Sequence, residues 1–205
     1  MQYFYNQGSS ASDPIFLLLH GSGGKETDLL PIAQRIEVRN AVLAARGNVN
    51  EEGKWRHFKR HSNGSVDVRD LTHRTKELNC FIDKASREHH FNRDHVIAIG
   101  YSNGANIAAS LLLHHGNVLK GAILFHPMVP IKREKLPDLT GTAIFISTGA
   151  TDSIVLPGES IKLKKMLESA GANVNLHITD YGHELAESEV EAAAEWYAEH
   201  FHGNG

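Results

Sequence analysis

The sequence predicts one α/β domain whose core is a doubly wound, mostly parallel sheet of about seven strands. Short apolar runs, rich in β-forming residues or bounded by turn residues, recur between longer segments with helical patterns. From the second run onward, the intervening segments are long enough for the crossovers that parallel pairing requires. No internal repeat, low-complexity tract or linker interrupts this alternation, so we expect residues 1–205 to form a single domain.

The strands are expected wherever an apolar run is bounded by turn residues or rich in β-formers. The segment GSSASDP at 8–14 has the composition of a turn that joins the first two strands, with antiparallel pairing as one option. The predicted strands are residues 2–6, 15–20, 41–44, 96–100, 121–125, 142–148 and 174–178.

The first helix is expected to end at Ile36, with Thr27 or Asp28 as alternative N-caps and Pro31 confined to its first turn. A second helix is predicted over residues 71–90. One face of it carries its apolar side chains, Leu78, Phe81, Ile82 and Ala85.

Three further helices are predicted at 102–115, 159–170 and 187–201. Gly116 and Gly171 stop the first two of these, because glycine readily adopts the backbone conformation that ends a helix. In a sheet of this kind, ligands bind beyond the carboxyl ends of the strands, so that edge should carry the site.

Composition excludes several classes of protein. The formal net charge of −3 leaves no basic excess to neutralise phosphates, so we expect no nucleic-acid partner. The single cysteine, Cys80, excludes an intramolecular disulfide and falls on the side of its helix opposite the apolar face. No basic segment followed by an apolar stretch opens the chain, and the longest strongly apolar run, 15–19, is far too short to span a bilayer. We therefore expect a cytoplasmic protein without membrane insertion.

The pentapeptide GYSNG, from Gly100 to Gly104, has the pattern G-x-S-x-G. A buried-looking strand precedes it and an apolar helix follows, which is the context of a nucleophile elbow. Such a turn needs small residues on both sides and exposes its serine, here Ser102, at the carboxyl edge of the sheet. The alternative is an ordinary glycine-rich turn with Ser102 as a helix cap.

A serine hydroxyl needs a base to take its proton and a third group to orient that base. The expected order is serine, acid, histidine, each acid or base following a later strand. Asp152 follows the strand at 142–148, and His183 follows the strand at 174–178. Asp94 precedes a strand and so lies at the wrong edge, while Asp180 shares the loop of His183 and would require that loop to fold back.

The glycine-rich stretch LLLHGSGGKETDLL could hold a phosphate or another negative charge. It does not satisfy the P-loop pattern, because Leu19 and Glu26 stand where a glycine and a hydroxyl residue are required. The stretch follows the strand that supplies one oxyanion donor in a serine hydrolase of this plan. We therefore expect the backbone N–H groups of Ser22 and Asn103 to donate hydrogen bonds to the negative oxygen of a tetrahedral intermediate.

The combination of LHGSGG, GYSNGAN, TGATDSIV and YGHEL resembles the α/β-hydrolase superfamily. More narrowly, it resembles the phospholipase/carboxylesterase group, which includes acyl-protein thioesterases and small bacterial carboxylesterases. The resemblance extends from Ile15 to the final helix and implies a minimal α/β-hydrolase fold. It also implies a nucleophile, a general base, an orienting acid and two oxyanion donors, namely Ser102, His183, Asp152, Ser22 and Asn103.

Within that group, the loop GNVNEEGKWRHFKRHSNGSVDVRDL resembles bacterial MhqD-like hydrolases, which are associated with hydroquinone and quinone resistance. Two features depart from the wider pattern. The chain has little before Ile15, so we expect at least one edge strand of the full plan to be missing. Asn103 replaces the glutamine often found after the serine in the thioesterase branch. This departure weakens the expectation of long acyl-protein substrates.

The surroundings of the site are expected to be open, because the segment between the strands at 121–125 and 142–148 is too short for a lid domain. The loop at 47–70 is the longest irregular segment. Trp55 and Phe58 in it could wall a pocket for an acyl or aromatic group, or could only anchor the loop. Met128 could touch the substrate, or could fill a gap in the core.

The same loop also carries basic residues and two histidines. Its basic residues could receive an anionic substrate, or could form a solvated face. His57 and His61 lack a third ligand, so we predict no metal, and no motif indicates a cofactor.

The sequence thus predicts a serine carboxylester hydrolase that acts through an acyl-enzyme on small or medium esters or thioesters, aromatic ones included. One alternative is a non-catalytic sensor or binding protein that uses the same pocket. Another is a triad enzyme that acts on lactones or carbon–carbon bonds. The expected partner is a small-molecule ester, and the sequence permits a homodimer without requiring one.

Overall fold

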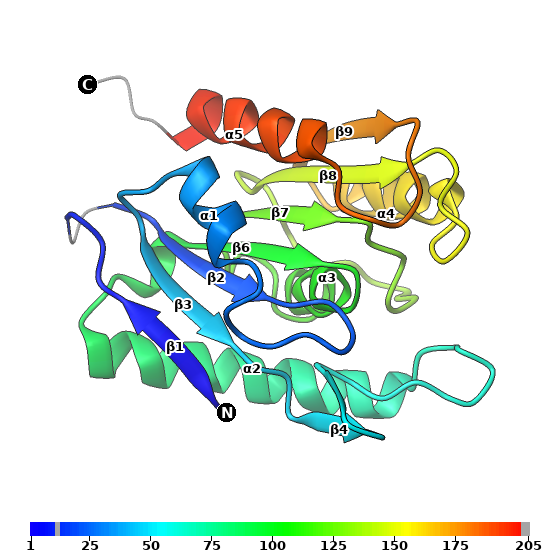
Figure 1. Ribbon diagram of the computed structural model, residues 1–205, viewed down its shortest axis with the longest axis horizontal. Helices are drawn as coiled ribbons and strands as arrows, with labels where there is room; N and C mark the ends of the chain where they lie inside the picture. Colours follow the sequence, from blue (N-terminus) through cyan, green and yellow to red (C-terminus); the bar gives the residue numbers. More distant parts are fainter. Residues whose placement is uncertain (11–12, 202–205) are drawn as a thin grey trace.

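The computed structural model describes residues 1–10 and 13–201, and its centre is a seven-stranded sheet in the order β1-β3-β2-β6-β7-β8-β9 (Figure 1). All neighbouring pairs are parallel except β1 with β3. The carboxyl ends of the parallel strands therefore meet at one edge of the sheet, and the predicted fold class is confirmed. The strands are β1 (Tyr3–Asn6), β2 (Ile15–Leu19), β3 (Ala41–Ala45), β6 (Val96–Tyr101), β7 (Gly121–Phe125), β8 (Ala143–Gly149) and β9 (Asn173–Thr179).

The first strand pairs differently from the simplest expectation. β1 is antiparallel, but its neighbour is β3 rather than β2, with Tyr3 opposite Ala45. Both sides of β2 are already occupied, by β3 and β6. The aromatic ring of Tyr3 packs on Phe81, with the ring centroids 5.3 Å apart. This contact holds β1 against the helix Val68–His89, which contains Phe81. Residues 11 and 12 of the connecting segment lie outside the described residues.

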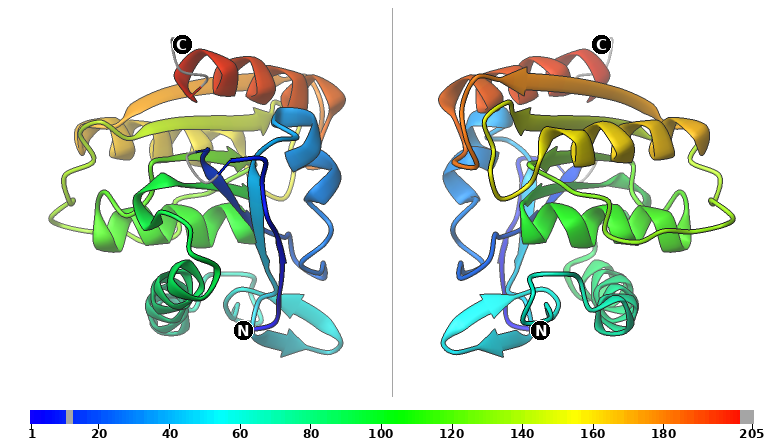
Figure 2. Two further views of the ribbon diagram at one scale, coloured as in Figure 1. Left: turned by 90° about the vertical axis from the view of Figure 1, so that its left-hand side faces the viewer. Right: turned by 90° about the vertical axis from the view of Figure 1, so that its right-hand side faces the viewer.

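Helices cover both faces of the sheet, as the two views from opposite sides of the molecule show (Figure 2). The buried side chains fall into two clusters, one on each face, because successive strand residues point to opposite sides. Leu17 and Leu43 belong to one cluster, and Phe16 and Leu18 to the other. One face is covered by α1 (Leu30–Ile36) and α5 (Glu187–Phe201), the other by α2 (Val68–His89), α3 (Asn103–His115) and α4 (Pro157–Ser169).

The helix ends test the expected caps. Pro31 does lie in the first turn of α1, but the N-cap is Leu29 without a side-chain hydrogen bond, so the expectation of Thr27 or Asp28 is wrong. The carboxylate of Asp28 instead accepts the backbone N–H of Lys25, at 3.0 Å. Gly116 ends α3 with φ 71°, as expected of a glycine at that position.

The loop at 47–70 is more ordered than its composition indicates. It contains a hairpin of β4 (Val49–Glu51) and β5 (Lys54–Arg56), joined by Glu52 and Gly53, both with positive φ. The expectation of an irregular segment is therefore wrong, since strands of three residues are too short to give a periodic signal. A 3₁₀ turn, η1 (Arg93–His95), precedes β6. None of the helices in the described part of the chain combines the length and apolarity needed to span a bilayer.

Candidate active site

Ser102 occupies the sharp turn between β6 and α3. Its φ of 51° and ψ of −109° are unusual for a residue with a side chain, and they turn its hydroxyl outward. Space explains the flanking glycines. A Cβ on Gly104 would lie 1.9 Å from the carbonyl oxygen of Leu19, and one on Gly100 would lie 2.6 Å from the backbone nitrogen of Ala105. The strand–turn–helix arrangement required of an elbow is thus present.

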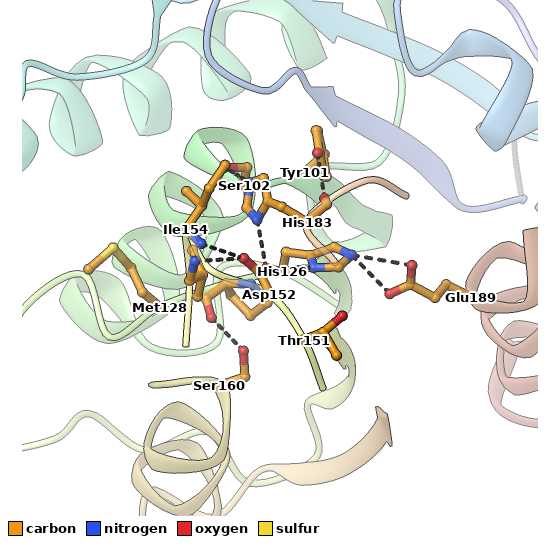
Figure 3. Close-up of polar contacts among 12 residues, drawn as sticks. Tyr101, Ser102, His126, Met128, Thr151, Asp152, Ile154, Ser160, His183 and Glu189 are labelled. Carbon is orange, nitrogen blue, oxygen red and sulfur yellow. Dashed lines mark hydrogen bonds and ion pairs between the residues drawn. The ribbon is translucent and has the colours of Figure 1, made fainter. Parts of the chain in front are cut away.

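The structure brings Ser102, His183 and Asp152 together at the carboxyl edge of the sheet (Figure 3). Nε2 of His183 lies 3.0 Å from Oγ of Ser102, and its Nδ1 lies 2.7 Å from Oδ2 of Asp152. The loop after β8 supplies the aspartate and the loop after β9 supplies the histidine, as their places in the sequence suggest. This geometry fits the tautomer in which Nδ1 donates to the carboxylate and Nε2 accepts from the serine.

Asp152 is 2% exposed and is held by donors on both of its oxygens. The backbone N–H groups of Ile154 and Val155 donate to Oδ1, each at 2.8 Å. Burial alone would raise the pKa of Asp152. The bonds from Val155, His183 and Ile154 outweigh it, so the pKa lies below its ordinary value. The carboxylate is therefore ionised at neutral pH and suited to orient His183.

Tyr101 holds the loop that carries His183. Its hydroxyl donates to the carbonyl oxygen of His183, at 2.7 Å. Burial, followed by the charge of Asp152, raises the pKa of Tyr101 to about 12. The phenol therefore stays neutral and remains a donor.

His126 is a site residue that the sequence reasoning missed. It follows β7, is 0% exposed, and has φ 52°. Its Nδ1 lies 3.1 Å from Oδ2 of Asp152, and its Nε2 lies 3.0 Å from Oε1 of Glu189, in the first turn of α5 (Figure 3). Its position after a strand's carboxyl end was an available signal, but fourteen histidines make any single one inconspicuous.

The glycine-rich turn after β2 is fixed beside the hairpin. The backbone N–H of Gly23 donates to the carbonyl oxygen of Trp55, at 2.8 Å, and Ser22 is exposed just before it. Asn103 is the first residue of α3, where backbone N–H groups have no acceptor within the helix. Its side-chain Oδ1 accepts the backbone N–H of His57, at 2.7 Å, which ties the loop at 47–70 to the serine turn.

The three side chains expected to contact substrate differ in their burial. Phe58 is 0% exposed and packs in the core, so it anchors its loop and cannot form a pocket wall in this structure. Trp55 is half-buried beside the glycine-rich turn, with the guanidinium of Arg46 5.6 Å from its ring. Met128 is also half-buried, and its backbone N–H donates to Oδ1 of Asn106 at the start of α3.

Metal-ligand side chains come together at one place among the described residues. His126, Asp152 and His183 offer ligand atoms within 4.8 Å of one another. Those atoms already bond to each other, since Oδ2 of the aspartate faces Nδ1 of both histidines. Of the two histidines considered in the loop at 47–70, His57 is buried and His61 is exposed.

The chain is similar to known hydrolases. The sequence pattern of the dienelactone hydrolase family matches residues 58–202. Over 199 residues, the chain is 50% identical to MhqD of Bacillus subtilis (strain 168), covering 97% of this chain and 98% of that protein.

Two solved structures give close matches of the whole fold. The crystal structure of a Bacillus cereus carboxylesterase has 50% sequence identity and a TM-score of 0.96, covering 98% of this chain and 95% of that one. The structure of YahD with malic acid has 32% identity and a TM-score of 0.93, covering 97% and 98%. Both matches span almost the full length of each chain.

Proposed function

The chain belongs to the dienelactone hydrolase family of α/β-hydrolases and is an esterase-type hydrolase, and we propose that it cleaves carboxylic esters through a serine acyl-enzyme. The observation that carries the proposal is the pair of short contacts on His183, 3.0 Å to Ser102 and 2.7 Å to Asp152. A histidine between a hydroxyl and a buried carboxylate is arranged to remove the proton of the hydroxyl.

The reaction follows from these contacts. Oγ of Ser102 attacks the ester carbonyl carbon while Nε2 of His183 takes its proton. The carbonyl oxygen, now negative, accepts hydrogen bonds from the backbone N–H groups of Ser22 and Asn103. His183 then protonates the leaving alcohol, and a water molecule, activated by the same nitrogen, releases the acid and restores Ser102.

The substrate is a small or medium ester that approaches from an open face. Ile154, two residues beyond Asp152, is 63% exposed, and an acyl or aromatic group could rest against it and Met128. Trp55 would contact the opposite side, beside the glycine-rich turn. No helix or strand lies between β7 and β8 to cover this face.

Lactone hydrolysis is a second candidate, favoured by the family whose pattern matches the chain. A lactone is a cyclic ester, so the same attack by Ser102 opens it and the alcohol stays attached to the acyl group. The two candidates share every proposed catalytic residue and differ only in the shape of the substrate that the open face accepts.

The test measures initial rates on p-nitrophenyl esters of increasing acyl length, and on simple aliphatic and aromatic lactones. Native protein is compared with Ser102→Ala and with a matched control, Ser169→Ala, whose serine is exposed at the end of α4. We expect native and control rates to agree and the Ser102→Ala rate to fall by at least about 10⁴-fold. Turnover that survives in Ser102→Ala would overturn the acyl-enzyme mechanism.

A further inference from the structure

His126 and Glu189 lie directly behind the acid of the proposed site, and neither is needed for the three-residue mechanism. Both side chains are 0% exposed. They come from distant parts of the chain, the loop after β7 and the first turn of α5 (Figure 3). Buried ionisable groups are costly unless they are paired, so their presence beside Asp152 requires an explanation.

The hydrogen-bond partners of His126 determine its charge. Nδ1 is within hydrogen-bond distance of Oδ2 of Asp152, at 3.1 Å, and Nε2 is within hydrogen-bond distance of Oε2 of Glu189, at 3.2 Å. Oε1 of Glu189 makes a further ion-pair contact with Nε2, at 3.0 Å. Carboxylate oxygens only accept, so both ring nitrogens must carry a proton. A neutral imidazole has one N–H and would leave one buried carboxylate facing a lone pair. An imidazolium at this position would satisfy both carboxylates.

The neighbouring groups support that charge state. Burial alone would lower the pKa of His126, but the hydrogen bond and charge of Glu189, followed by those of Asp152, raise it above the ordinary value. The other polar rings packed around it come from β6 and from the loop after β9. Tyr101 lies 5.9 Å away and His183 5.2 Å away between ring centroids.

Glu189 is itself held in place. Its Oε2 accepts the backbone N–H of Ala186, at 2.8 Å, just before α5 begins. Burial would raise its pKa, yet the bonds from His126 and from Ala186 bring that pKa below the ordinary value. Glu189 thus remains charged and anchors His126 to the first turn of the final helix.

We propose that His126, held as an imidazolium by Glu189, is a positioning residue that fixes the carboxylate of Asp152 and offsets part of its charge. This inference rests on the proposed function, because it explains how the base of that site is tuned. Asp152, His126 and Glu189 together carry one negative charge, which the proton gained by His183 balances during the reaction. His126 is no proton relay, since it faces only acceptors and keeps both its protons.

The sign of the expected effect follows from the charges. Without the imidazolium, the full charge of Asp152 acts on His183 and stabilises its protonated form, which cannot accept the serine proton. The acidic limb of the pH profile of kcat/KM should therefore move to higher pH. A residue that only supports the fold would change thermal stability and leave that limb in place.

The experiment compares His126→Gln, Glu189→Gln and the double variant with the native protein. The double variant removes the opposite charges together, so it retains the net charge of the site if a single variant fails to fold. His114→Gln, at the far end of α3, and Glu187→Gln, exposed in the same turn as Glu189, are the matched controls. The readouts are kcat, KM and pH profiles on p-nitrophenyl acetate, together with the rate at which a fluorophosphonate labels Ser102.

We expect kcat of His126→Gln to fall about 10- to 100-fold with little change in KM, as for a misplaced catalytic group. Its acidic limb, and that of the double variant, should move up by about one pH unit or less. Glu189→Gln should have a smaller effect in the His126→Gln background than alone, because it acts through His126. The controls should match the native protein.

A direct measurement of charge is independent of turnover. With ¹⁵N-labelled histidine, the two ring nitrogens of His126 in the native protein should both give imidazolium signals at about pH 7. A neutral ring there, or unshifted pH profiles in folded His126→Gln and double variants, would overturn the inference while leaving the proposed function intact. Native turnover and labelling no greater than in Ser102→Ala would instead show that the proposed function has failed, and this inference with it.

Discussion

His20 and His126 are equally buried histidines on opposite sides of the serine turn, yet their partners favour different charge states. His20 is 1% exposed, and its Nδ1 faces the carbonyl oxygen of Gly21, at 2.6 Å, while its Nε2 accepts the backbone N–H of Gly47, at 3.0 Å. One acceptor and one donor fit a neutral imidazole. His126 faces two carboxylates and fits an imidazolium.

The comparison teaches that partner chemistry, rather than burial, decides the charge of a buried histidine here. Burial lowers the pKa of His20, and the partly opposing bond to Gly21 does not reverse the shift. At His126 the same burial is outweighed by Glu189 and Asp152. The protein thus keeps a neutral ring behind the glycine-rich turn and a charged ring behind the acid.

Removing the charge of Asp152, which contacts both His126 and His183, should have the largest effect on activity. Asp152→Asn keeps the size of the side chain but cannot hold His183 in the tautomer needed to accept a proton. We expect kcat on p-nitrophenyl acetate to fall by about 10⁴-fold, with the fold retained. Steady-state kinetics at neutral pH measure this, and a loss of less than about tenfold would contradict the assigned role of Asp152.

His126→Leu should lower the free energy of unfolding. It leaves the carboxylates of Asp152 and Glu189 buried without their shared cation, and breaking a buried ion pair costs about 3–5 kcal/mol in the free energy of unfolding. Urea unfolding, followed by circular dichroism, measures the change. A variant as stable as the native protein would mean that His126 carries no charge.

His20→Leu is the matched change in the neutral region, and we expect it to cost less. It leaves the N–H of Gly47 and the carbonyl of Gly21 without their partner, but no unpaired charge, for a loss of about 1–3 kcal/mol. The same unfolding measurement applies. If His20→Leu destabilised the protein more than His126→Leu, the contrast between the two regions would be wrong.

The pH dependence of stability should give the smallest but most specific difference. The pKa of Glu189 lies below its ordinary 4.5, so its contribution is present above that pH and is lost as the pH falls through the folded-state value. The pKa of His126 lies above its ordinary 6.5, so its contribution is present below that pH and is lost as the pH rises through the folded-state value.

Thermal unfolding from about pH 3 to about pH 9 separates the two contributions. The native protein should lose stability at both ends of this range relative to the His126→Gln, Glu189→Gln double variant. Glu187→Gln should follow the native curve, because Glu187 is exposed and solvent screens its ion pair with Arg35. Parallel native and double-variant curves would contradict both assigned charges.

Much of the fold could be predicted because its signals are local. The apolar run of Ile15–Leu19 and the helix stop at Gly116 each depend on residues within a few positions. The hairpin at Val49–Arg56 escaped prediction because its strands are too short for a period to emerge. The partner of β1 was not predicted either. Its pairing with β3 depends on which edge of the sheet is vacant, and that is settled only when the other strands have assembled.

Sequence patterns alone predicted the seven strands of the main sheet and the five α-helices in their order along the chain. They also predicted the G-x-S-x-G turn and the places of Asp152 and His183 after later strands. These follow from residue size, hydrophobic period and the rule that parallel strands end at one edge. Tertiary folding was needed to bury Phe58 in the core and to bring His126 between Asp152 and Glu189. The charge of an imidazole depends on groups brought within about 3 Å by folding, and residue spacing along the chain does not encode that distance.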